Sequence, residues 1–273
     1  MDKPEGAFKV ELGKLDVNTP HDKILANVML NCKRQIPQLQ WYGQKSEACV
    51  IACGGPSLRA NFLELRDLHF QRKPIFAVNG AANWLVSQNI RPAAVVIMDA
   101  QPHNVGFVQE PIIGCKYFLA SQCDPGLFDA CKGRDVTIFH ALSLGEDSEE
   151  TAFLDNYYGE KRWSHVVGAS TVGTRAIWLA KMLGYELQHV FGLDSCVMET
   201  GHHAYAQEWQ DNEQVHNIWC GGRHFKCTGW HIAQAEGFKD FVKAAGERFS
   251  LNVHGDGLLA HMVRSGKDLE KRG

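Results

Sequence analysis

Short runs of apolar residues, each ending at glycine or polar residues, recur along the chain and alternate with segments of helical periodicity. The first run covers residues 48–53 and stops at the glycine-rich loop Gly54-Gly55-Pro56-Ser57. Continuous apolar runs of this length are typical of strands buried on both faces of a parallel sheet. The same pattern predicts further strands at 74–78, 93–98, 117–120, 136–139, 189–193 and 249–253.

Helical periodicity occupies much of the chain between these runs. Thr19 and Pro20 predict a helix start, with Thr19 as the cap and Pro20 at the first helical position, and the apolar spacing extends this helix to about Gln38. Helices are also predicted after the first and second strands, before Gly184 and after residue 228. Side-chain caps are expected from Ser57 or Asn61, from Ser170 or Thr171, and from Thr228.

Strands that alternate with helices predict an α/β fold, with a mostly parallel sheet that carries helices on both faces. Residues 215–227 predict a C-terminal hairpin that turns at Gly221-Gly222. The polar stretch 144–162 receives no element. We divide the chain into an N-terminal helical extension, 1–47, and a catalytic domain, 48–273.

Composition narrows the classes of function. The 273 residues include 28 basic and 31 acidic side chains, so a net charge of −3 offers no general field for a polyanion. No stretch of 18 apolar residues predicts a membrane span, and the first residues do not resemble a secretory signal. The nine cysteines follow no framework pattern and several lie in apolar runs, so we expect reduced core cysteines and a cytoplasmic protein.

Polar residues and glycines follow nearly every predicted strand. In open α/β sheets, ligands bind outside the carboxyl ends of the strands, so these positions are the candidate site. The candidates are Gly54, Gly55, Pro56, Ser57, Asn79, Gly80, Asp99, Gln101, Asn104, Ser121, Gln122, His140 and Asp194.

The glycine-rich loop has a physical reason to bind phosphate. Gly54 and Gly55 allow close approach of a ligand to the backbone, and the helix that follows offers unpaired N–H groups at its N-terminus. An ordinary strand-to-helix turn explains the same residues, and both interpretations stay open. The loop lacks the lysine of a Walker A motif and the spacing of the G-x-G-x-x-G fingerprint, which argues against a P-loop kinase.

A second small-residue turn, residues 168–173, opens another predicted helix. Ser170 and Thr171 could supply hydroxyl and N–H groups to a phosphate or sugar, or could simply cap a tightly packed helix. Arg175 and Arg223 are candidates for pairing with phosphate because a guanidinium matches its geometry, and solvated surface positions are the alternative.

Histidines near strand ends are candidate general bases, because the histidine pKa lies near neutrality. His203 follows Asp194 in the most polar stretch of the chain, although a surface loop with incidental histidines is equally consistent. Cys220, His224 and Cys227, with His202 and His203, do not have a strong zinc spacing, and a hairpin explains them. Several aromatic residues are expected to form core packing or a stacking lid: Tyr205, Trp209, Trp219, Phe225 and Trp230.

Five segments taken together carry a family resemblance. They are 51–58, Asn79-Gly80, Met98-Asp99, 168–171 and Gly192-Leu193-Asp194 with His203-Ala204. Their order resembles the 6-hydroxymethylpterin diphosphokinase-like family, which also includes motility-associated-factor glycosyltransferases, and similar motifs occur in bacterial sialyltransferases.

The resemblance implies a Rossmann-like fold and a nucleotide-activated donor. Gly54, Gly55 and Ser57 would hold the donor phosphates, Asn79 and Asp99 would contact the donor or a metal, and His203 would lie near the acceptor. Cys53 stands where the motif has glycine, and residues 195–199 depart from the glycosyltransferase branch, which affects the acceptor more than the donor. The short length also resembles phage-encoded members, whose acceptors could be modified DNA bases.

Three hypotheses follow. The favoured one is a glycosyltransferase that moves a sugar from a nucleotide-sugar to a hydroxyl acceptor, with His203 or His140 as base, backbone N–H groups and Arg175 on the leaving phosphate, and no required cofactor. The second is an ATP-dependent diphosphokinase acting on a pterin-like alcohol, with Mg²⁺ on Asp99 and Asp194. The third is a non-enzymatic nucleotide- or DNA-binding module, for which the expected basic face is missing.

Overall fold

The computed structural model describes residues 19–270 except 46, 144, 161, 200, 202, 206–213 and 247–249. The predictions that concern residues 1–18, His202, Trp209 and Phe249 therefore lie outside the described residues. The described elements are, in chain order, α1 (His21–Cys32), β1 (Cys49–Ala52), α2 (Ser57–Ala60), α3 (Phe62–Phe70), β2 (Ile75–Val78), α4 (Ala81–Ser87), β3 (Ala94–Ile97), the 3₁₀ helix η1 (Pro102–Val108), β4 (Lys116–Ala120), α5 (Pro125–Ala130), β5 (Val136–Phe139), α6 (Glu149–Tyr158), α7 (Val172–Met182), β6 (Leu187–Phe191), β7 (Val215–Cys220), β8 (Arg223–Thr228), α8 (Gly229–Ala245), β9 (Ser250–Val253) and α9 (Leu258–Ser265).

Seven of the described strands form one parallel sheet in the order β5-β4-β3-β2-β1-β6-β9. The chain fills the sheet from β1 outward to β5 and then returns to β6 on the other side of β1. The strand order therefore reverses between β1 and β6, and the loops after these two strands diverge. In open α/β sheets this reversal is where a ligand crevice forms.

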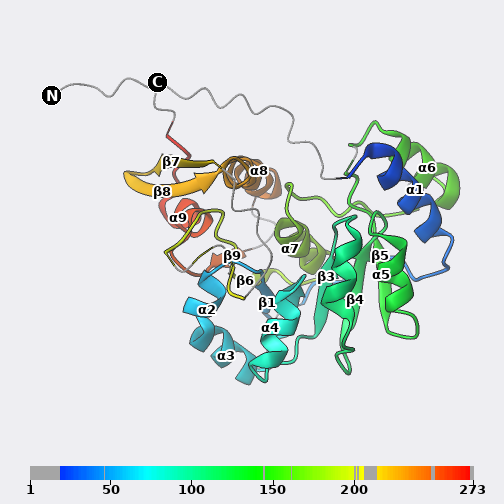
Figure 1. Cartoon of the computed structure of the whole chain (residues 1–273), viewed down its shortest axis with the longest axis horizontal. Helices are drawn as coiled ribbons and strands as arrows, with labels where there is room; N and C mark the ends of the chain where they lie inside the picture. Colours follow the sequence, from blue (N-terminus) through cyan, green and yellow to red (C-terminus); the bar gives the residue numbers. More distant parts are fainter. Residues whose placement is uncertain are drawn as a thin grey trace.

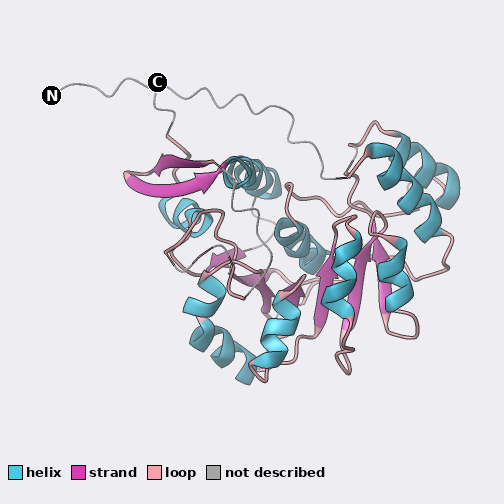
Figure 2. Cartoon of the chain, viewed as in Figure 1, coloured by secondary structure: helices cyan, strands magenta, loops and turns pink. Residues whose placement is uncertain are grey.

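Helices cover both faces of the sheet, which Figures 1 and 2 show together with the separate two-stranded ribbon. Crossovers between parallel strands are right-handed, so the helices between β1 and β5 lie on one face and α7 lies on the opposite one. In agreement with this, α7 packs against β1, β2 and β3 while α4 packs on β2. The α/β, Rossmann-like architecture expected from the sequence is confirmed.

The antiparallel ribbon β7–β8 is the predicted C-terminal hairpin. Cys220 pairs with Arg223 across the turn, and Gly221 and Gly222 both have positive φ, at 53° and 77°. Two consecutive positive φ angles are what a tight two-residue hairpin turn requires, and glycine adopts them without steric cost. The hairpin leads directly into α8, the longest described helix.

Two predicted caps are confirmed. Thr171 accepts a hydrogen bond from the Thr174 N–H at the start of α7, and Thr228 forms a capping box with His231 at the start of α8. The prediction that Ser57 or Asn61 caps a helix is wrong, because neither α2 nor α3 has a side-chain cap.

The predicted first helix is wrong at both ends. Pro20 precedes α1, and Thr19 does not cap it, because the Thr19 hydroxyl accepts from Gln101 Nε2 at 2.9 Å. The helix ends at Cys32 rather than near Gln38. Gln35 has φ 55°, and the residue before Pro37 disfavours helical angles, so the chain leaves the helix before the apolar spacing ends.

Four described elements have no counterpart in the predictions: η1, α5, α6 and α9. Two of them carry ordinary start signals, since Asp124 caps α5 ahead of Pro125 and Ser148 caps α6 within the stretch left without an element. The short length of α5 and the polar surface of α6 conceal their periodicity. Helix α9 follows β9, so α8, the helix that Thr228 caps and that the sequence predicted as the final one, is not the last helix.

The hydrophobic core is continuous and contains every strand of the large sheet except parts of its edges. All nine cysteines lie among the described residues, and all are buried and free of disulfides. Within the described part of the chain, no helix has the length and apolar character needed to span a bilayer.

Candidate active site

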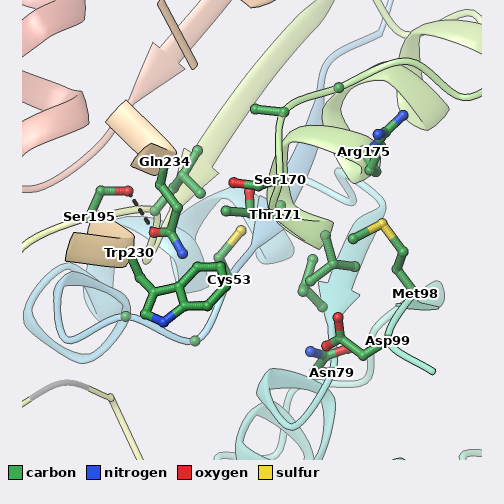
Figure 3. A pocket seen from close by; sticks show the side chains of 18 of the residues that line it. Cys53, Asn79, Met98, Asp99, Ser170, Thr171, Arg175, Ser195, Trp230 and Gln234 are labelled. Carbon is green, nitrogen blue, oxygen red and sulfur yellow. Dashed lines mark hydrogen bonds between the residues drawn. The ribbon is translucent and has the colours of Figure 1, made fainter. Parts of the chain in front are cut away.

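A cleft of about 810 Å³ opens at the carboxyl ends of the strands, beside the reversal between β1 and β6. Figure 3 shows that side chains from separate elements face one another across it. Eleven of the predicted site residues line the cleft: Gly54, Gly55, Asn79, Asp99, Gln101, Gln122, Ser170, Thr171, Arg175, Asp194 and His203. The candidates chosen at strand ends thus meet at one edge of the sheet, together with Ser170, Thr171, Arg175 and His203, which were chosen on other grounds.

Seven other predicted residues do not line the cleft: Pro56, Ser57, Gly80, Asn104, Ser121, His140 and Arg223. Asn104 Nδ2 donates to the Asp99 backbone carbonyl, and Arg223 pairs with Asp256. Tyr205 and Phe107 cover Gly80, while Ser57 and Ser121 are almost completely buried. The Ser57 hydroxyl accepts from the Gly192 N–H at 3.1 Å, so it joins two loops beneath the cleft. Gly80, Ser57 and Ser121 therefore lie behind the walls of the cleft rather than facing the cavity.

His140 is sealed within the fold. Its side chain is 1% exposed, and its ring packs against Tyr158 and Trp163. Burial lowers the pKa of His140 to about 3, with His165 nearby acting in the same direction. A neutral imidazole without a path to the cleft is poorly placed to deprotonate an acceptor.

The glycine-rich loop is held by the protein itself. The Gly55 N–H donates to the Gly192 carbonyl at 2.9 Å, and the Ser57 N–H donates to Asp194 Oδ2 at 2.9 Å. A Cβ on Gly55 would collide with the Asp194 carboxylate and lie 2.6 Å from the Gly192 carbonyl oxygen. Gly55 is therefore glycine because the loops after β1 and β6 approach each other closely.

Asp194 occupies the junction of three loops. Its Oδ2 accepts from Ser57 at the start of α2, and its backbone carbonyl accepts from the Leu259 N–H in α9. The side chain is 4% exposed, and its Oδ1 is buried without a hydrogen-bond partner among the described residues. Burial raises the pKa of Asp194, and the hydrogen bonds from Ser57 oppose that effect.

The segment 203–205 lies over the glycine-rich loop. The Ala204 N–H donates to the Gly54 carbonyl at 2.9 Å, and His203 Nδ1 lies 3.3 Å from the same oxygen. A Cβ on Gly54 would come within 2.5 Å of the Tyr205 hydroxyl. His203 therefore reaches the cleft from above this loop, and the contact favours the tautomer with its proton on Nδ1, which makes Nε2 the basic nitrogen.

The N-terminus of α7 forms the middle of the cleft. All six residues 168–173 line the cavity, and Ser170 is exposed there. The Arg175 N–H donates to the Thr171 carbonyl as the first helical hydrogen bond, so the amides of Val172 and Gly173 precede it and point out of the helix end. Such amides and the helix dipole favour an anion.

Arg175 adds a full charge beside this helix end (Figure 3). Its Nη1 donates to the Val166 carbonyl at 2.5 Å and lies 3.2 Å from His165 Nε2, whereas its Nε is buried without a partner among the described residues. Burial lowers the pKa of Arg175 to about 10, opposed by the Glu150 carboxylate. The guanidinium therefore stays charged at neutral pH although burial makes the charge unfavourable. A bound anion would offset this cost of burial.

Asp99 and Asn79 lie at the other end of the cleft. Asp99 is exposed to water within the cavity but is surrounded by protein on its other sides. Loss of surrounding water raises the pKa of its carboxyl, while a hydrogen bond from Asn79 and the charge of His103 act against that rise. The Asp99 carboxyl group and the His103 imidazole therefore both line this end of the cavity, whereas the sequence predicted only Asp99 there.

Several lining residues were not predicted, among them His103, Ser195 and Gln234. His103 follows a predicted strand end by a few residues, so the same rule would have found it had η1 been recognised. Gln234 stands four residues after Trp230 in α8, which places both on one helix face. Nothing in the sequence indicated that this face turns to the cleft, because it depends on how α8 docks.

Metal ligands do not gather in the described part of the chain, where no group of three or more histidine, cysteine, aspartate or glutamate residues could hold an ion. Cys220 and His224 have other contacts: the thiol donates to the Lys267 carbonyl, and the imidazole pairs with Asn217. The hairpin interpretation thus accounts for these residues.

Comparison with known proteins gives a family and a fold. The model of the family described as 6-hydroxymethylpterin diphosphokinase MptE-like matches residues 22–200. The search of curated proteins found no match.

Several solved structures are similar to this chain. One is the MAf glycosyltransferase from Magnetospirillum magneticum AMB-1, with 12% identity and a TM-score of 0.62, over 88% of this chain and 37% of that one. The chain thus spans well under half of that structure. A mammalian sialyltransferase in complex with Gal-beta-1-3GalNAc-ortho-nitrophenol aligns over 86% of both chains, with 7% identity and a TM-score of 0.41.

Proposed function

The chain belongs to the 6-hydroxymethylpterin diphosphokinase MptE-like family, and from this premise we propose that it is a nucleotide-dependent transferase whose cleft binds the donor phosphates at the start of α7. The observation that carries the proposal is the pairing of the α7 N-terminus with Arg175 on one wall of the cleft. Amides at a helix end and a guanidinium are both suited to a phosphate, and here they are adjacent.

The glycine-rich loop supports this site indirectly. The N–H groups of Gly55 and Ser57 donate to protein oxygens, and the Asp194 carboxylate occupies the start of α2, where an anion would otherwise bind. We therefore place the phosphates at α7 rather than at α2. The glycine-rich loop forms the floor of the cleft, and its Gly54 carbonyl holds the segment 203–205 above that floor.

Among transfer reactions, we favour glycosyl transfer. In this reaction an acceptor hydroxyl oxygen attacks the anomeric carbon of the donor sugar, while the bond from that carbon to the phosphate oxygen breaks. The electron pair leaves with the phosphate, whose charge Val172, Gly173 and Arg175 would stabilise. The hydroxyl proton passes to a base, for which we propose His203, as its ring reaches the cleft.

Diphosphate transfer from ATP is the alternative that the family description favours. That reaction needs charge neutralisation, usually by Mg²⁺ held between carboxylates and phosphates. Asp194 does not fit this role, because its carboxylate is enclosed and already accepts from Ser57. Asp99 is exposed in the cleft, whereas Asp194 lines it with a nearly buried carboxylate, so we do not propose a magnesium site shared by these two residues.

A thermal-shift screen of the full chain with nucleoside mono-, di- and triphosphates and nucleotide-sugars tests the proposal. A nucleotide present at a hundred times its dissociation constant should stabilise the fold by about 2.7 kcal/mol. Ribose without phosphate serves as the control and should give no shift. Absence of a shift with every nucleotide would contradict both forms of the proposal.

A further inference from the structure

We propose that Trp230, Gln234 and Ser195 form the nucleobase subsite of the cleft, with Trp230 as the stacking surface and Gln234 as the residue that contacts the base edge. This inference rests on the proposed function and deepens it, since it assigns the two ends of the cleft to different parts of the donor. The three residues line the cavity at the end away from Asn79 and Asp99 (Figure 3).

The placement of this group follows from one face of α8. Trp230, Gln234 and Gly237 stand at i, i+4 and i+7, so they share a face. The core side of the helix is formed by Ile232, Ala235 and Phe238, which leaves the other three residues directed elsewhere.

Gly237 fixes this face against the α7 loop. A Cβ on Gly237 would lie 2.8 Å from the Ala169 methyl group, so the two backbones are in close contact. Gln234 and Trp230 therefore follow, one and two turns along, beside the loop that leads into α7.

Trp230 offers an unused ring. It is only partly buried, and among the described residues no aromatic ring stacks on it, although other tryptophans such as Trp84 and Trp178 pair with neighbouring rings. An indole that lines a polar cavity without a ring partner is suited to a flat ligand. Stacking of a nucleobase on an aromatic side chain contributes about 1–3 kcal/mol and tolerates every base.

Gln234 supplies directional hydrogen bonding. The Ser195 hydroxyl donates to Gln234 Oε1 at 3.1 Å, which turns the amide nitrogen toward the cavity (Figure 3). Ser195 is held with φ 47°, a conformation uncommon for a residue other than glycine, in the loop after β6. Strained residues of this kind persist where the surrounding structure fixes them, and they concentrate at ligand sites.

The order of groups along the cleft matches the order of groups in a nucleotide. Trp230 and Gln234 lie at one end, the α7 N-terminus with Ser170 and Thr171 follows, and Asn79 and Asp99 lie at the far end. A base on Trp230 would place the phosphates at α7 and the transferred group toward Asp99. The subsite thus gives the donor a single orientation.

Calorimetric titration of the full chain tests the subsite. The four ribonucleoside 5′-monophosphates are compared with ribose 5-phosphate, which has the same sugar and phosphate without the base. In the wild type, the nucleotides should bind more tightly than ribose 5-phosphate. Trp230→Ala should remove about five- to hundredfold of nucleotide affinity and leave ribose 5-phosphate affinity unchanged, whereas Trp230→Phe should retain most of it.

Two further readouts address the same claim. Gln234→Ala should alter the relative affinities of the four nucleotides, because it removes the group that contacts the base edge. Nucleotide binding should quench tryptophan fluorescence in the wild type and in Trp41→Phe, a control that removes an exposed tryptophan outside the cleft, but much less in Trp230→Phe.

The outcomes separate this inference from the proposed function. If the nucleotides keep their advantage over ribose 5-phosphate in Trp230→Ala, the base binds elsewhere and the subsite is wrong, while nucleotide binding itself stands. If ribose 5-phosphate and the nucleotides bind the wild type equally, the base makes no contact and the subsite is again wrong. If neither binds, the proposed function fails and the subsite fails with it.

Discussion

The backbone N–H of Ser57 donates a hydrogen bond to the carboxylate of Asp194, 2.9 Å away, across the junction between β1 and β6. Ser57 starts the helix that follows the glycine-rich loop, so the protein's own carboxylate occupies the end of that helix. This contact explains why a loop with the composition of a phosphate site serves as the floor of the cleft.

The first prediction concerns the charge of Asp194. Because burial raises its pKa in the folded state above the ordinary value of 3.8, the wild type binds this proton more tightly when folded. Its contribution to stability is therefore fully present below about pH 3.8 and is lost as pH rises through the raised pKa. D194N has no such titration, so the wild type should lose stability relative to D194N as pH rises from about 3.8 through the raised pKa.

Urea unfolding of both proteins at several pH values measures this difference. D194A, which also removes the acceptor for the Ser57 N–H, should be less stable than D194N by about 1–3 kcal/mol at every pH. A free-energy difference between D194N and the wild type that does not change with pH would show that Asp194 does not titrate as a buried acid.

The second prediction concerns the close approach at Gly55. Gly55→Ala places a methyl group against the Asp194 carboxylate and the Gly192 carbonyl, so it should destabilise the fold by about 1–3 kcal/mol. Gly43→Ala is the matched control, because no atom lies within 4 Å of its Cβ position, and it should change stability by less than about 0.5 kcal/mol. Equal stability of the two variants would mean that the loops after β1 and β6 do not approach each other this closely.

The third prediction concerns Arg175 as a phosphate ligand. Arg175→Gln should weaken nucleotide binding about tenfold or more, because a hydrogen bond to a charged group contributes about 1.5–3 kcal/mol. Arg175→Lys keeps the charge opposite Glu150 but loses the planar guanidinium, so it should fold normally and bind with intermediate affinity. Arg91→Gln is the control. Arg91 is exposed and precedes β3, so it lies at the amino ends of the strands, away from the cleft, and the variant should bind as the wild type does.

Metal removal distinguishes the two transfer reactions. With Asp194 enclosed, we expect transfer from a nucleotide-sugar to proceed in the presence of a strong chelator at close to its ordinary rate. Product formation can be followed by mass spectrometry, with and without EDTA and with added Mg²⁺. Activity that appears only with ATP and Mg²⁺ would instead assign the chain to diphosphate transfer.

Strand ends were the part of the site that the sequence could locate. The apolar runs before Gly54, Asn79, Asp99 and Asp194 were recognisable because strands buried on both faces leave continuous apolar segments. Parallel pairing then brings those ends to one edge, so seven candidates chosen at strand ends line the same cleft without any knowledge of the packing.

The interior partners could not be predicted in the same way. The Ser57 amide contacts Asp194, which lies 137 positions further along the chain. The local sequence pattern around Ser57 contains no information about such a distant contact. His140 follows a strand just as Asp99 does, but the packing of Tyr158 and Trp163 seals it. The nucleobase face of α8 likewise depends on how Gly237 docks on Ala169.

The most direct test of the account is nucleotide binding by Ser170→Asp compared with Ser170→Asn, measured by calorimetry on the full chain. Ser170 is exposed in the cleft at the start of α7, so the aspartate places an anion where the phosphates should bind and, by the helix dipole, should not destabilise the fold. If the donor phosphates bind at α7, S170D should bind nucleotides at least about tenfold more weakly than S170N, a loss of about 1.4 kcal/mol, with both proteins equally folded. Equal affinity of the two variants would contradict it, because the donor phosphates would then lie elsewhere.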